Sequence, residues 1–378
     1  MRIGIDARLW NETGVGRYIR NLVKYLHEID HNNYYVLFIR REDCDRIKGY
    51  QNIKIVKTDI HWHSLAEQVK FPQIINLENI DLMHFPYFAV PVFYNKPYVV
   101  TIHDLIIDHF PTGKATTRHP LIYHGKRLSY KYIIRNAAKK SKKIVTVSEA
   151  TKSEIIKHYK VPDDKVIVTY EGIDERINSQ IVSNEKRINL QSLNPKEKYF
   201  LYVGNAYPHK NLELLLNAFD EVHKTIENVK FVLVGKEDYF YKHVRAKIDD
   251  LNLKDSVLLL HDINDEELSY LYKNALGLVM PSLMEGFGLP AVEAMSLSCL
   301  VIASDIPALK EICQDAGIYF DPYKEKELVV KLLERIGDEE NAKFKKSVDL
   351  GIERSKIFSW QKMARETLKV YESCISLR

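Results

Sequence analysis

Short apolar runs rich in β-branched residues alternate with longer amphipathic segments along the whole chain. In the first half, the candidate strands are residues 3–6, 35–39, 53–56, 82–84, 98–102, 144–147 and 166–169. In the second half, they are residues 199–204, 231–235, 257–260, 278–280, 300–303 and 318–320. Nearly continuous apolar strands separated by helical segments predict parallel sheets that helices cover on both faces. The fold class is therefore α/β.

The segment after Asn211 shows the helical period most clearly. Its apolar residues are spaced i, i+3, i+4 and i+7, which forms one stripe along a helix. These residues are Leu212, Leu215, Leu216 and Phe219. Because asparagine is a favoured N-cap residue, we expect the Asn211 side chain to cap this helix.

The chain length predicts two domains, since 378 residues are about twice the usual size of one compact domain. Residues 176–198 are polar and show no apolar period, so they are interpreted as a linker. We expect a first domain over 1–178, a linker over 179–198, a second domain over 199–360 and a final helix over 361–378. Two Rossmann-like, doubly wound domains facing each other across a cleft would bind ligands at the carboxyl ends of their strands.

Charge is unevenly distributed along the chain. The overall balance of +4 is too small to predict a nucleic-acid-binding protein. Residues 1–178 contain 28 Lys and Arg against 20 Asp and Glu, whereas residues 179–378 contain 27 against 31. The densest basic run lies in a helical pattern and comprises Lys126, Arg127, Lys131, Arg135, Lys139, Lys140, Lys142 and Lys143. It is either a solvated helix face or a surface for anionic lipid or a phosphorylated acceptor.

The remaining composition indicates an ordinary soluble protein. Apolar residues make up 46% of the chain, and no stretch of 18 uninterrupted apolar residues occurs. The N-terminus starts a strand directly and lacks the apolar region of a signal peptide. The four cysteines are far apart and form no Cys-x-x-Cys pair, which argues against a zinc ribbon and a disulfide framework. We expect a cytoplasmic protein, with peripheral attachment to the inner face of a membrane as a further possibility.

The most specific motif is the segment 281–295, with the sequence PSLMEGFGLPAVEAM. It follows an apolar strand and leads into a helix. Gly286 and Gly288 allow close approach of the backbone, and Pro290 suits the first turn of a helix. The amides of residues 288–291, at the positive end of the helix dipole, would form an anion site that fits a diphosphate. Two carboxylates, Glu285 on the loop and Glu293 in the helix, would then reach a sugar ring and a ribose diol. The alternative is a plain strand–loop–helix turn with incidental acids.

This motif resembles the donor site of retaining family 4 glycosyltransferases, which have the GT-B fold. The segment 202–211, YVGNAYPHKN, is similar to the family's strand–loop–helix segment that places a basic residue on the donor phosphates. The resemblance extends over essentially the whole chain and is strongest to bacterial O-antigen mannosyltransferases. Its other parts are GIDAR at 4–8, GVGRY at 14–18, TIHDL at 101–105, VS at 147–148, GID at 172–174 and SW at 359–360.

The resemblance implies roles for individual residues. The implied catalytic residues are Glu285, Lys210 and His103. The implied donor-binding residues are Gly14, Gly16, Asn205, His209, Gly286, Phe287, Gly288, Leu289 and Glu293. The second domain would hold the nucleotide sugar, the first would receive the acceptor, and the final helix would cross back onto the first domain.

Four of these positions, in two loops and at one strand end, also have a physical rationale from the sequence. Lys210, between a strand and a helix, can neutralise a leaving diphosphate, or it is merely a solvated lysine. His103 ends an apolar strand, where it can hydrogen-bond a sugar hydroxyl, or it is a satisfied strand-end histidine. Gly14 and Gly16 offer backbone amides to a phosphate or sugar, or they form a plain turn; no third glycine completes a dinucleotide motif.

Five positions depart from the family pattern or point elsewhere. Members often carry Arg where Asn205 or His209 stands, so a second phosphate-binding cation is not assured. His261 stands where many members have glycine, near the nucleotide base. The pair Asp43 and Asp45 matches the Asp-x-Asp pattern of metal-dependent transferases, but it lies in a charged loop and is expected at the surface.

The resemblance thus implies a retaining hexosyltransferase, and we expect no cofactor and no metal. It would move mannose from GDP-mannose to a glycan or lipid-linked acceptor in polysaccharide or O-antigen synthesis, without binding nucleic acid. A UDP-sugar-dependent hexosyltransferase of the same fold and a non-catalytic nucleotide-sugar-binding protein are the alternatives.

Overall fold

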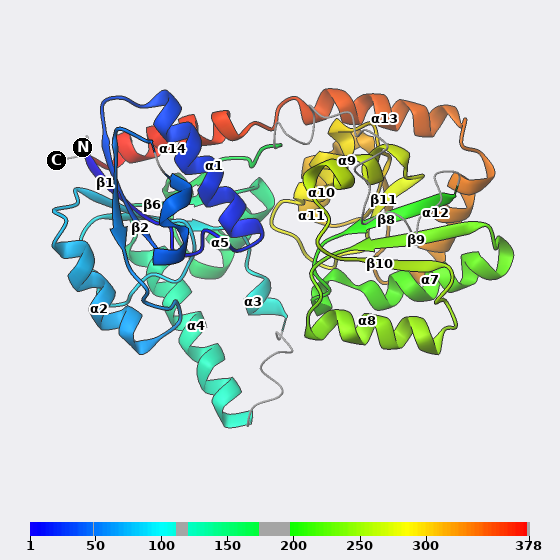
Figure 1. Ribbon diagram of the computed structural model, residues 1–378, viewed down its shortest axis with the longest axis horizontal. Coiled ribbons are helices and arrows are strands. Elements are labelled where there is room, and N and C mark those ends of the chain that lie inside the picture. Colours follow the sequence, from blue (N-terminus) through cyan, green and yellow to red (C-terminus); the bar gives the residue numbers. More distant parts are fainter. Residues whose placement is uncertain (48, 111–119, 174–196, 376–378) are drawn as a thin grey trace. The chain divides into compact units, whose positions relative to one another are not determined.

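The computed structural model describes residues 1–47, 49–110, 120–173 and 197–375 (Figure 1). The chain divides into two compact units. Unit 1 comprises Met1–Asp108, Arg118–Gly172 and Ser359–Arg378, and unit 2 comprises His109–Thr117 and Ile173–Phe358. Most of the predicted linker, 179–198, lies outside the described residues, and Lys198 already belongs to the first strand of unit 2.

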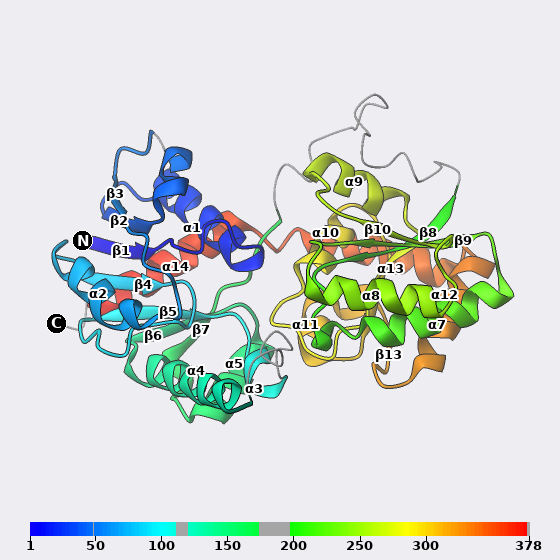
Figure 2. The same cartoon turned by 60° about the horizontal axis from the view of Figure 1, so that its bottom comes forward.

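Unit 1 is built on a parallel sheet of seven strands in the order β3-β2-β1-β4-β5-β6-β7. The strands are β1 (Arg2–Asp6), β2 (Tyr34–Ile39), β3 (Ile53–Lys57), β4 (Leu82–Phe85), β5 (Tyr98–Ile102), β6 (Lys143–Thr146) and β7 (Val166–Val168). The helices are α1 (Gly14–Ile29), α2 (Leu65–Asn76), α3 (Ile106–His109), α4 (Pro120–Lys140), α5 (Glu149–Tyr159), α14 (Trp360–Ile375) and the short 3₁₀ helices η1 (Arg41–Ile47) and η3 (Asp163–Lys165). Helices α1 and α14 pack side by side, while α4 and α5 lie on the other face of the sheet (Figures 1 and 2).

Unit 2 is built on a parallel sheet of six strands in the order β10-β9-β8-β11-β12-β13. The strands are β8 (Lys198–Val203), β9 (Val229–Val234), β10 (Val257–Leu260), β11 (Gly277–Met280), β12 (Val301–Ser304) and β13 (Gly317–Phe320). The helices are α7 (Leu212–Thr225), α8 (Tyr239–Asp250), α9 (Asp265–Asn274), α10 (Leu289–Ser296), α11 (Pro307–Cys313), α12 (Glu325–Gly337), α13 (Ala342–Ser355) and the 3₁₀ helices η6 (Pro208–Lys210) and η7 (Gln314–Ala316). Figure 2 shows α7 and α8 on one side of this sheet and α9 on the other.

Every predicted strand is present, with its ends within about two residues of the expected ones. The central strands are buried along their whole length, which explains their continuous apolar sequences. Both sheets are doubly wound. In unit 1 the winding direction reverses between β1 and β4, and in unit 2 it reverses between β8 and β11. Ligands of open α/β sheets bind beyond the carboxyl ends of the strands at such switch points.

The predicted helix after Asn211 is confirmed as α7, whose apolar stripe is buried. The predicted side-chain cap is wrong. Asn211 has left-handed backbone angles (φ 57°, ψ 37°), whereas a capping side chain needs an extended backbone to reach the first helical amides. Its amide group instead donates to the carbonyl oxygens of Pro281, at 3.2 Å, and Pro322, at 2.9 Å. Asn211 therefore ties α7 to two loops of unit 2.

The last helix, α14, belongs to unit 1, as predicted. The Tyr371 hydroxyl lies 2.6 Å from Nδ1 of the buried His84 on β4, and Nε2 of that ring lies 2.8 Å from the Thr101 hydroxyl. Where the chain leaves unit 1, Gly172 passes so close to the returning chain that a Cβ atom would lie 2.1 Å from the Trp360 nitrogen. Gly172, the first residue of the motif at 172–174, therefore packs against the motif at 359–360, and both lie next to points where the chain passes between the units.

Candidate active site

The strongest sequence motifs of unit 2 meet at its switch point. Lys210 ends η6, which follows β8, and Glu285 lies on the loop that follows β11. Strands β8 and β11 are hydrogen-bonded neighbours. The two loops are joined by their backbones as well, since the Leu283 amide donates to the His209 carbonyl at 2.7 Å. Residues far apart in the sequence are thus held together at the edge where a Rossmann-like sheet binds its ligand.

Lys210 and Glu285 form an ion pair that is largely shielded from solvent. The Lys210 ammonium donates to Glu285 Oε1 at 2.6 Å, and the Ser282 hydroxyl donates to the same oxygen at 2.7 Å. The side chains are 16% and 8% exposed, respectively. Burial alone would raise the pKa of Glu285, but the Lys210 charge and these hydrogen bonds hold it below its ordinary value. Glu285 is therefore an anion at neutral pH, and Lys210 has a carboxylate counter-ion.

His209 does not supply the second cation. Its side chain is buried, and burial together with the neighbouring Lys210 charge lowers its pKa to about 4. The imidazole is therefore neutral at neutral pH. Asn205 is uncharged, and its side-chain oxygen accepts from the Tyr207 amide at 3.3 Å. Of the positions predicted to contact the donor phosphates, Lys210 is the one that carries positive charge.

The predicted anion site at the start of α10 offers fewer backbone amides than the sequence suggested. Pro290 has no amide hydrogen, and the Ala291 amide donates to the Gly288 carbonyl at 2.9 Å within the first turn. The amides of Gly288 and Leu289 are the ones this run can offer to a ligand. Gly288 has φ of 100°, and a Cβ atom there would lie 2.8 Å from Leu309 Cδ2. Glycine is therefore required both by the turn and by the packing against α11.

The second carboxylate of the motif, Glu293, lies inside α10 and is almost completely buried. Its Oε2 accepts a hydrogen bond from the buried Tyr272 hydroxyl of α9 at 2.9 Å. Phe287 is buried against Phe358, with the two rings edge to face at 5.4 Å between their centroids. Gly286 is buried in the same loop. These contacts give Glu293 and Phe287 packing roles within unit 2.

In unit 1, His103 follows β5, and both of its ring nitrogens are engaged. Nε2 lies 3.0 Å from the Pro86 carbonyl oxygen, and Nδ1 lies 3.3 Å from a Glu171 carboxylate oxygen. Both partners can only accept hydrogen bonds, so satisfying them requires an imidazolium with two N–H donors. Burial lowers the pKa of His103, but the Glu171 carboxylate outweighs it and raises the pKa above its ordinary value. The expected hydrogen bond to a sugar hydroxyl therefore requires one of these contacts to open.

The glycines that follow β1 begin a helix rather than an open loop, since α1 starts at Gly14. A Cβ atom at Gly14 would meet nothing within 4 Å, whereas at Gly16 it would lie 2.6 Å from the Trp10 carbonyl oxygen. Gly16 is therefore required by close packing. The Thr13 side chain does not cap α1. The amides in the first turn of α1 therefore receive no hydrogen-bond acceptor from the Thr13 side chain.

The prediction that the Asp-x-Asp pair lies at the surface is wrong for Asp43. Asp43 is buried in η1, where it accepts a hydrogen bond from the Asn11 amide, and Asp45 is exposed. Burial follows from the packing of η1 against the loop after β1, which a charged sequence does not reveal. Within the described part of the chain, no cluster of three or more His, Cys, Asp and Glu could hold a metal ion. All four cysteines are buried, and none forms a disulfide.

Only some side chains of the basic run between Lys126 and Lys143 form an exposed charged face. The side chains of Lys126 and Arg127 lie outside the described residues, and Lys143 donates to the Asp164 carbonyl at 2.5 Å. The exposed members are Arg135, Lys139, Lys140 and Lys142. Among the helices in the described residues, none has the length and apolar character needed to cross a membrane.

Comparisons with known families agree with this architecture. Residues 13–176 match the model of "Glycosyltransferase Family 4", and residues 183–350 match that of "Glycosyl transferases group 1". Together the two matches take in most of both units. The chain belongs to the group 1 and family 4 glycosyltransferases. It is therefore a glycosyltransferase, and the resemblance drawn from the motifs is confirmed.

Relatives and solved structures extend this assignment. The O-antigen chain mannosyltransferase B of Escherichia coli is 27% identical over 369 residues, which cover 95% of this chain and 96% of that protein. The O-antigen chain mannosyltransferase RfbU of Salmonella typhimurium is 28% identical over 73% of this chain and 71% of its own length. Sucrose-phosphate synthase from Thermosynechococcus elongatus matches the whole fold with a TM-score of 0.80 at 20% identity, with complete coverage of both chains. Anabaena HepE in complex with UDP-glucose matches with a TM-score of 0.76 at 17% identity over 99% of this chain and 100% of its own. These matches confirm the predicted GT-B class of fold.

Sequence reasoning missed the partners of the predicted residues. Glu171 raises the pKa of His103, Ser282 donates a hydrogen bond to Glu285 in addition to the one from Lys210, and Tyr272 donates to Glu293. Ser282 lies within the donor motif and could have been found there. Glu171 directly precedes the Gly-Ile-Asp motif, but nothing in its local pattern links it to His103.

Proposed function

We propose that this glycosyltransferase transfers mannose from GDP-mannose to a glycan or lipid-linked acceptor with retention of the anomeric configuration. The observation that carries the proposal is the Lys210–Glu285 pair at the switch point of unit 2, in a chain similar over 95% of its length to an O-antigen chain mannosyltransferase. A single positive charge beside a helix start is what a departing diphosphate needs.

The proposed chemistry assigns the leaving group to unit 2. The bond between the sugar C1 and the phosphate oxygen breaks, and a bond between C1 and the acceptor oxygen forms. The acceptor proton passes to the departing phosphate. Lys210 and the amides of Gly288 and Leu289 stabilise the charge that develops on that phosphate. Glu285 holds the Lys210 ammonium in place until the diphosphate competes for it. With this arrangement inside the protein, no metal ion is needed for the leaving group.

Nucleotide-sugar screening tests the donor. Saturable protection against thermal unfolding by GDP-mannose, but not by GDP-glucose, UDP-glucose or UDP-galactose, would support the proposal because a bound ligand raises stability by mass action. Release of GDP only when a glycan acceptor is added would establish transfer rather than binding. The anomeric configuration follows from the coupling between C1 and H1 in the product by NMR. Inversion, or protection by UDP-sugars alone, would overturn the corresponding part of the proposal.

A UDP-sugar-dependent hexosyltransferase is the second candidate. It is favoured by the structural similarity to Anabaena HepE, whose structure was solved with UDP-glucose. His261 also stands where many family members have glycine, at a position expected near the nucleotide base. Its Nδ1 lies 2.6 Å from the Gly235 carbonyl oxygen, and its buried Nε2 has no hydrogen-bond partner among the residues that the structure describes. The same screen separates the two donors.

A further inference from the structure

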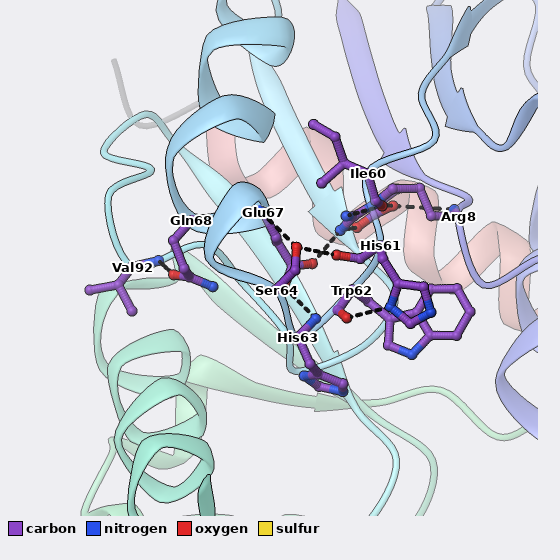
Figure 3. Close-up of polar contacts among 10 residues, drawn as sticks. Arg8, Ile60, His61, Trp62, His63, Ser64, Glu67, Gln68 and Val92 are labelled. Carbon is purple, nitrogen blue, oxygen red and sulfur yellow. Dashed lines mark hydrogen bonds and ion pairs between the residues drawn. The ribbon is translucent and has the colours of Figure 1, made fainter. Parts of the chain in front are cut away.

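A loop at the carboxyl edge of the unit 1 sheet carries two aromatic rings that no predicted role uses. The loop joins β3 to α2 and includes residues 60–64. The His61 imidazole stacks on the Trp62 indole, with ring centroids 4.4 Å apart and an angle of 26° between the planes (Figure 3). His61 is exposed and Trp62 is half-buried, so the stack lies at the protein surface.

Buried charges hold this loop from below. Arg8, which follows β1, donates to Glu67 at 2.6 Å and to the Ile60 carbonyl at 3.2 Å (Figure 3). It also donates to Asp6 at 2.7 Å. Both Arg8 and Glu67 are at most 2% exposed. The other Glu67 oxygen accepts the His63 amide at 2.8 Å. The free-energy cost of desolvating buried charges offsets much of the attraction between them. The main effect of these ion pairs is therefore to fix the position of the loop.

The loop backbone is further constrained at Ser64 and His63. The Ser64 hydroxyl caps α2 by accepting the Glu67 amide at 3.1 Å and donates to the His61 carbonyl at 2.7 Å. His63 has φ of 58°, a left-handed conformation that non-glycine residues seldom adopt. Strained residues of this kind persist where the surrounding structure imposes them, commonly at ligand-binding sites. The aromatic stack is thus presented by a rigid loop.

This loop and the predicted site residue His103 both lie next to the segment 86–88. The segment 86–88 follows β4 at the switch point of unit 1. Its Pro86 carbonyl contacts His103, while the rings of Tyr87 and Phe88 lie 6.0 and 6.1 Å from the His63 ring. The aromatic loop and His103 therefore flank one three-residue segment at the sheet edge where ligands bind.

We propose that the His61–Trp62 stack is a subsite for the acceptor and that it binds a sugar ring of a glycan. A pyranose has one face made of C–H groups, which an aromatic ring can cover while the hydroxyls stay hydrogen-bonded at the rim. The inference rests on the proposed transfer to a glycan acceptor and adds where that acceptor binds. Arg8 and Glu67 are positioning residues, because they act through the loop.

Steady-state kinetics test the subsite. With GDP-mannose as donor and α-linked mannobiose, mannotriose and N-acetylglucosamine disaccharides as acceptors, Trp62→Ala should raise the acceptor KM about tenfold, the loss expected for one aromatic stacking contact. The donor KM should not follow it, and Trp62→Phe should restore much of the affinity. Phe93→Ala removes another exposed aromatic side chain of unit 1 and is the matched control. An acceptor KM in Trp62→Ala equal to that of Phe93→Ala would overturn the subsite.

Fluorescence provides a test that does not need turnover. The chain has three tryptophans, and Trp10 and Trp360 are buried, so acrylamide quenching reports mainly on Trp62. The oligosaccharides should reduce quenching in the wild type, and Trp62→Phe should lose this response. Shielding of Trp62 without GDP release would retain the subsite and overturn the transfer reaction. GDP release without shielding would retain the reaction and overturn the subsite.

Discussion

The Lys210–Glu285 pair makes a prediction that separates binding from turnover. Glu285 is 8% exposed beside Lys210; in Lys210→Ala its carboxylate loses this counter-ion and keeps the Ser282 hydroxyl as a hydrogen-bond donor. A diphosphate would then face an uncompensated negative charge instead of an ammonium group. Loss of one preorganised group that stabilises developing charge costs about 10²–10³ in turnover, or about 3–4 kcal/mol. Burial, the largest cause of the lowered pKa of His209, persists in the variant, so His209 is not expected to replace the missing cation.

Glu285→Gln should have a different effect. The gross attraction across the 2.6 Å contact is roughly 6 kcal/mol at an effective dielectric constant of 20, most of it offset by desolvation. Without its counter-ion, Lys210 is available to the diphosphate, so affinity for GDP should hold or increase. Turnover should fall at least about tenfold because the ammonium is no longer held in place. Combined with Lys210→Ala, the Gln substitution should recover GDP affinity by about 1–2 kcal/mol relative to Lys210→Ala alone.

The assays are calorimetric titration of GDP and initial rates for the two single variants and the double variant. Lys224→Ala is the matched control, since Lys224 also lies 2.6 Å from a carboxylate oxygen, of Asp220, but is exposed. A double variant that binds GDP no more tightly than Lys210→Ala alone would refute the reasoning. The pH dependence adds a check. Because the pKa of Glu285 is lowered by folding, the pair contributes stability above pH 4.5, and the Tm advantage over Glu285→Gln should disappear as pH falls below that value.

Four further predictions follow from single contacts or from the proposed chemistry. The pKa of His103 is raised by Glu171, so its contribution to stability is complete below pH 6.5 and is lost as pH rises through the folded value; the Tm difference from His103→Gln should shrink over that range. Gly172→Ala should lower Tm by several degrees or prevent folding, because its Cβ would lie 2.1 Å from backbone, whereas Gly337→Ala, which meets nothing within 4 Å, should not. Transfer activity should survive exhaustive treatment with EDTA, and its abolition with recovery in Mn²⁺ would contradict the assignment of the leaving group to protein groups. Sedimentation with anionic liposomes should fall steeply with salt and weaken when the exposed basic side chains are changed to glutamine, while equal binding to neutral liposomes would restore the solvated-face interpretation. Those side chains are Arg135, Lys139, Lys140 and Lys142.

The fold was predictable because its strands are short, apolar and buried on both faces. A strand such as β5, with the sequence YVVTI, is buried at all five positions, follows Lys-Pro and precedes His-Asp, so the local pattern alone identifies it. Strand order is not a local property. The neighbours β8 and β11 are separated in the sequence by two complete strand–helix units, and their adjacency follows from the doubly wound topology. For this reason the sequence could place Lys210 and Glu285 at strand ends but could not show that they form an ion pair.

Errors arose where a residue's surroundings override its usual preference. Asparagine commonly caps helices, yet Asn211 adopts a left-handed backbone because its side chain ties two loop carbonyls. An aspartate in a charged segment is usually solvated, yet Asp43 is buried beside Asn11. In both cases the deciding partner comes from a distant part of the chain. Composition and periodicity contain no information about such partners.

The two histidines of the predicted site show how far this limit extends into function. The sequence places both His103 and His209 after an apolar strand, with Asp104 beside the first and Lys210 beside the second, but it does not show which further groups each ring contacts. In the structure, His103 lies between a carboxylate and a carbonyl, which require an imidazolium, while His209 is buried next to a lysine, which requires a neutral ring. The same side chain is thus a cation in unit 1 and an uncharged group in unit 2. Because His209 is neutral, Lys210 is the cation among the residues predicted to contact the diphosphate. For this reason Lys210→Ala should lower turnover severely.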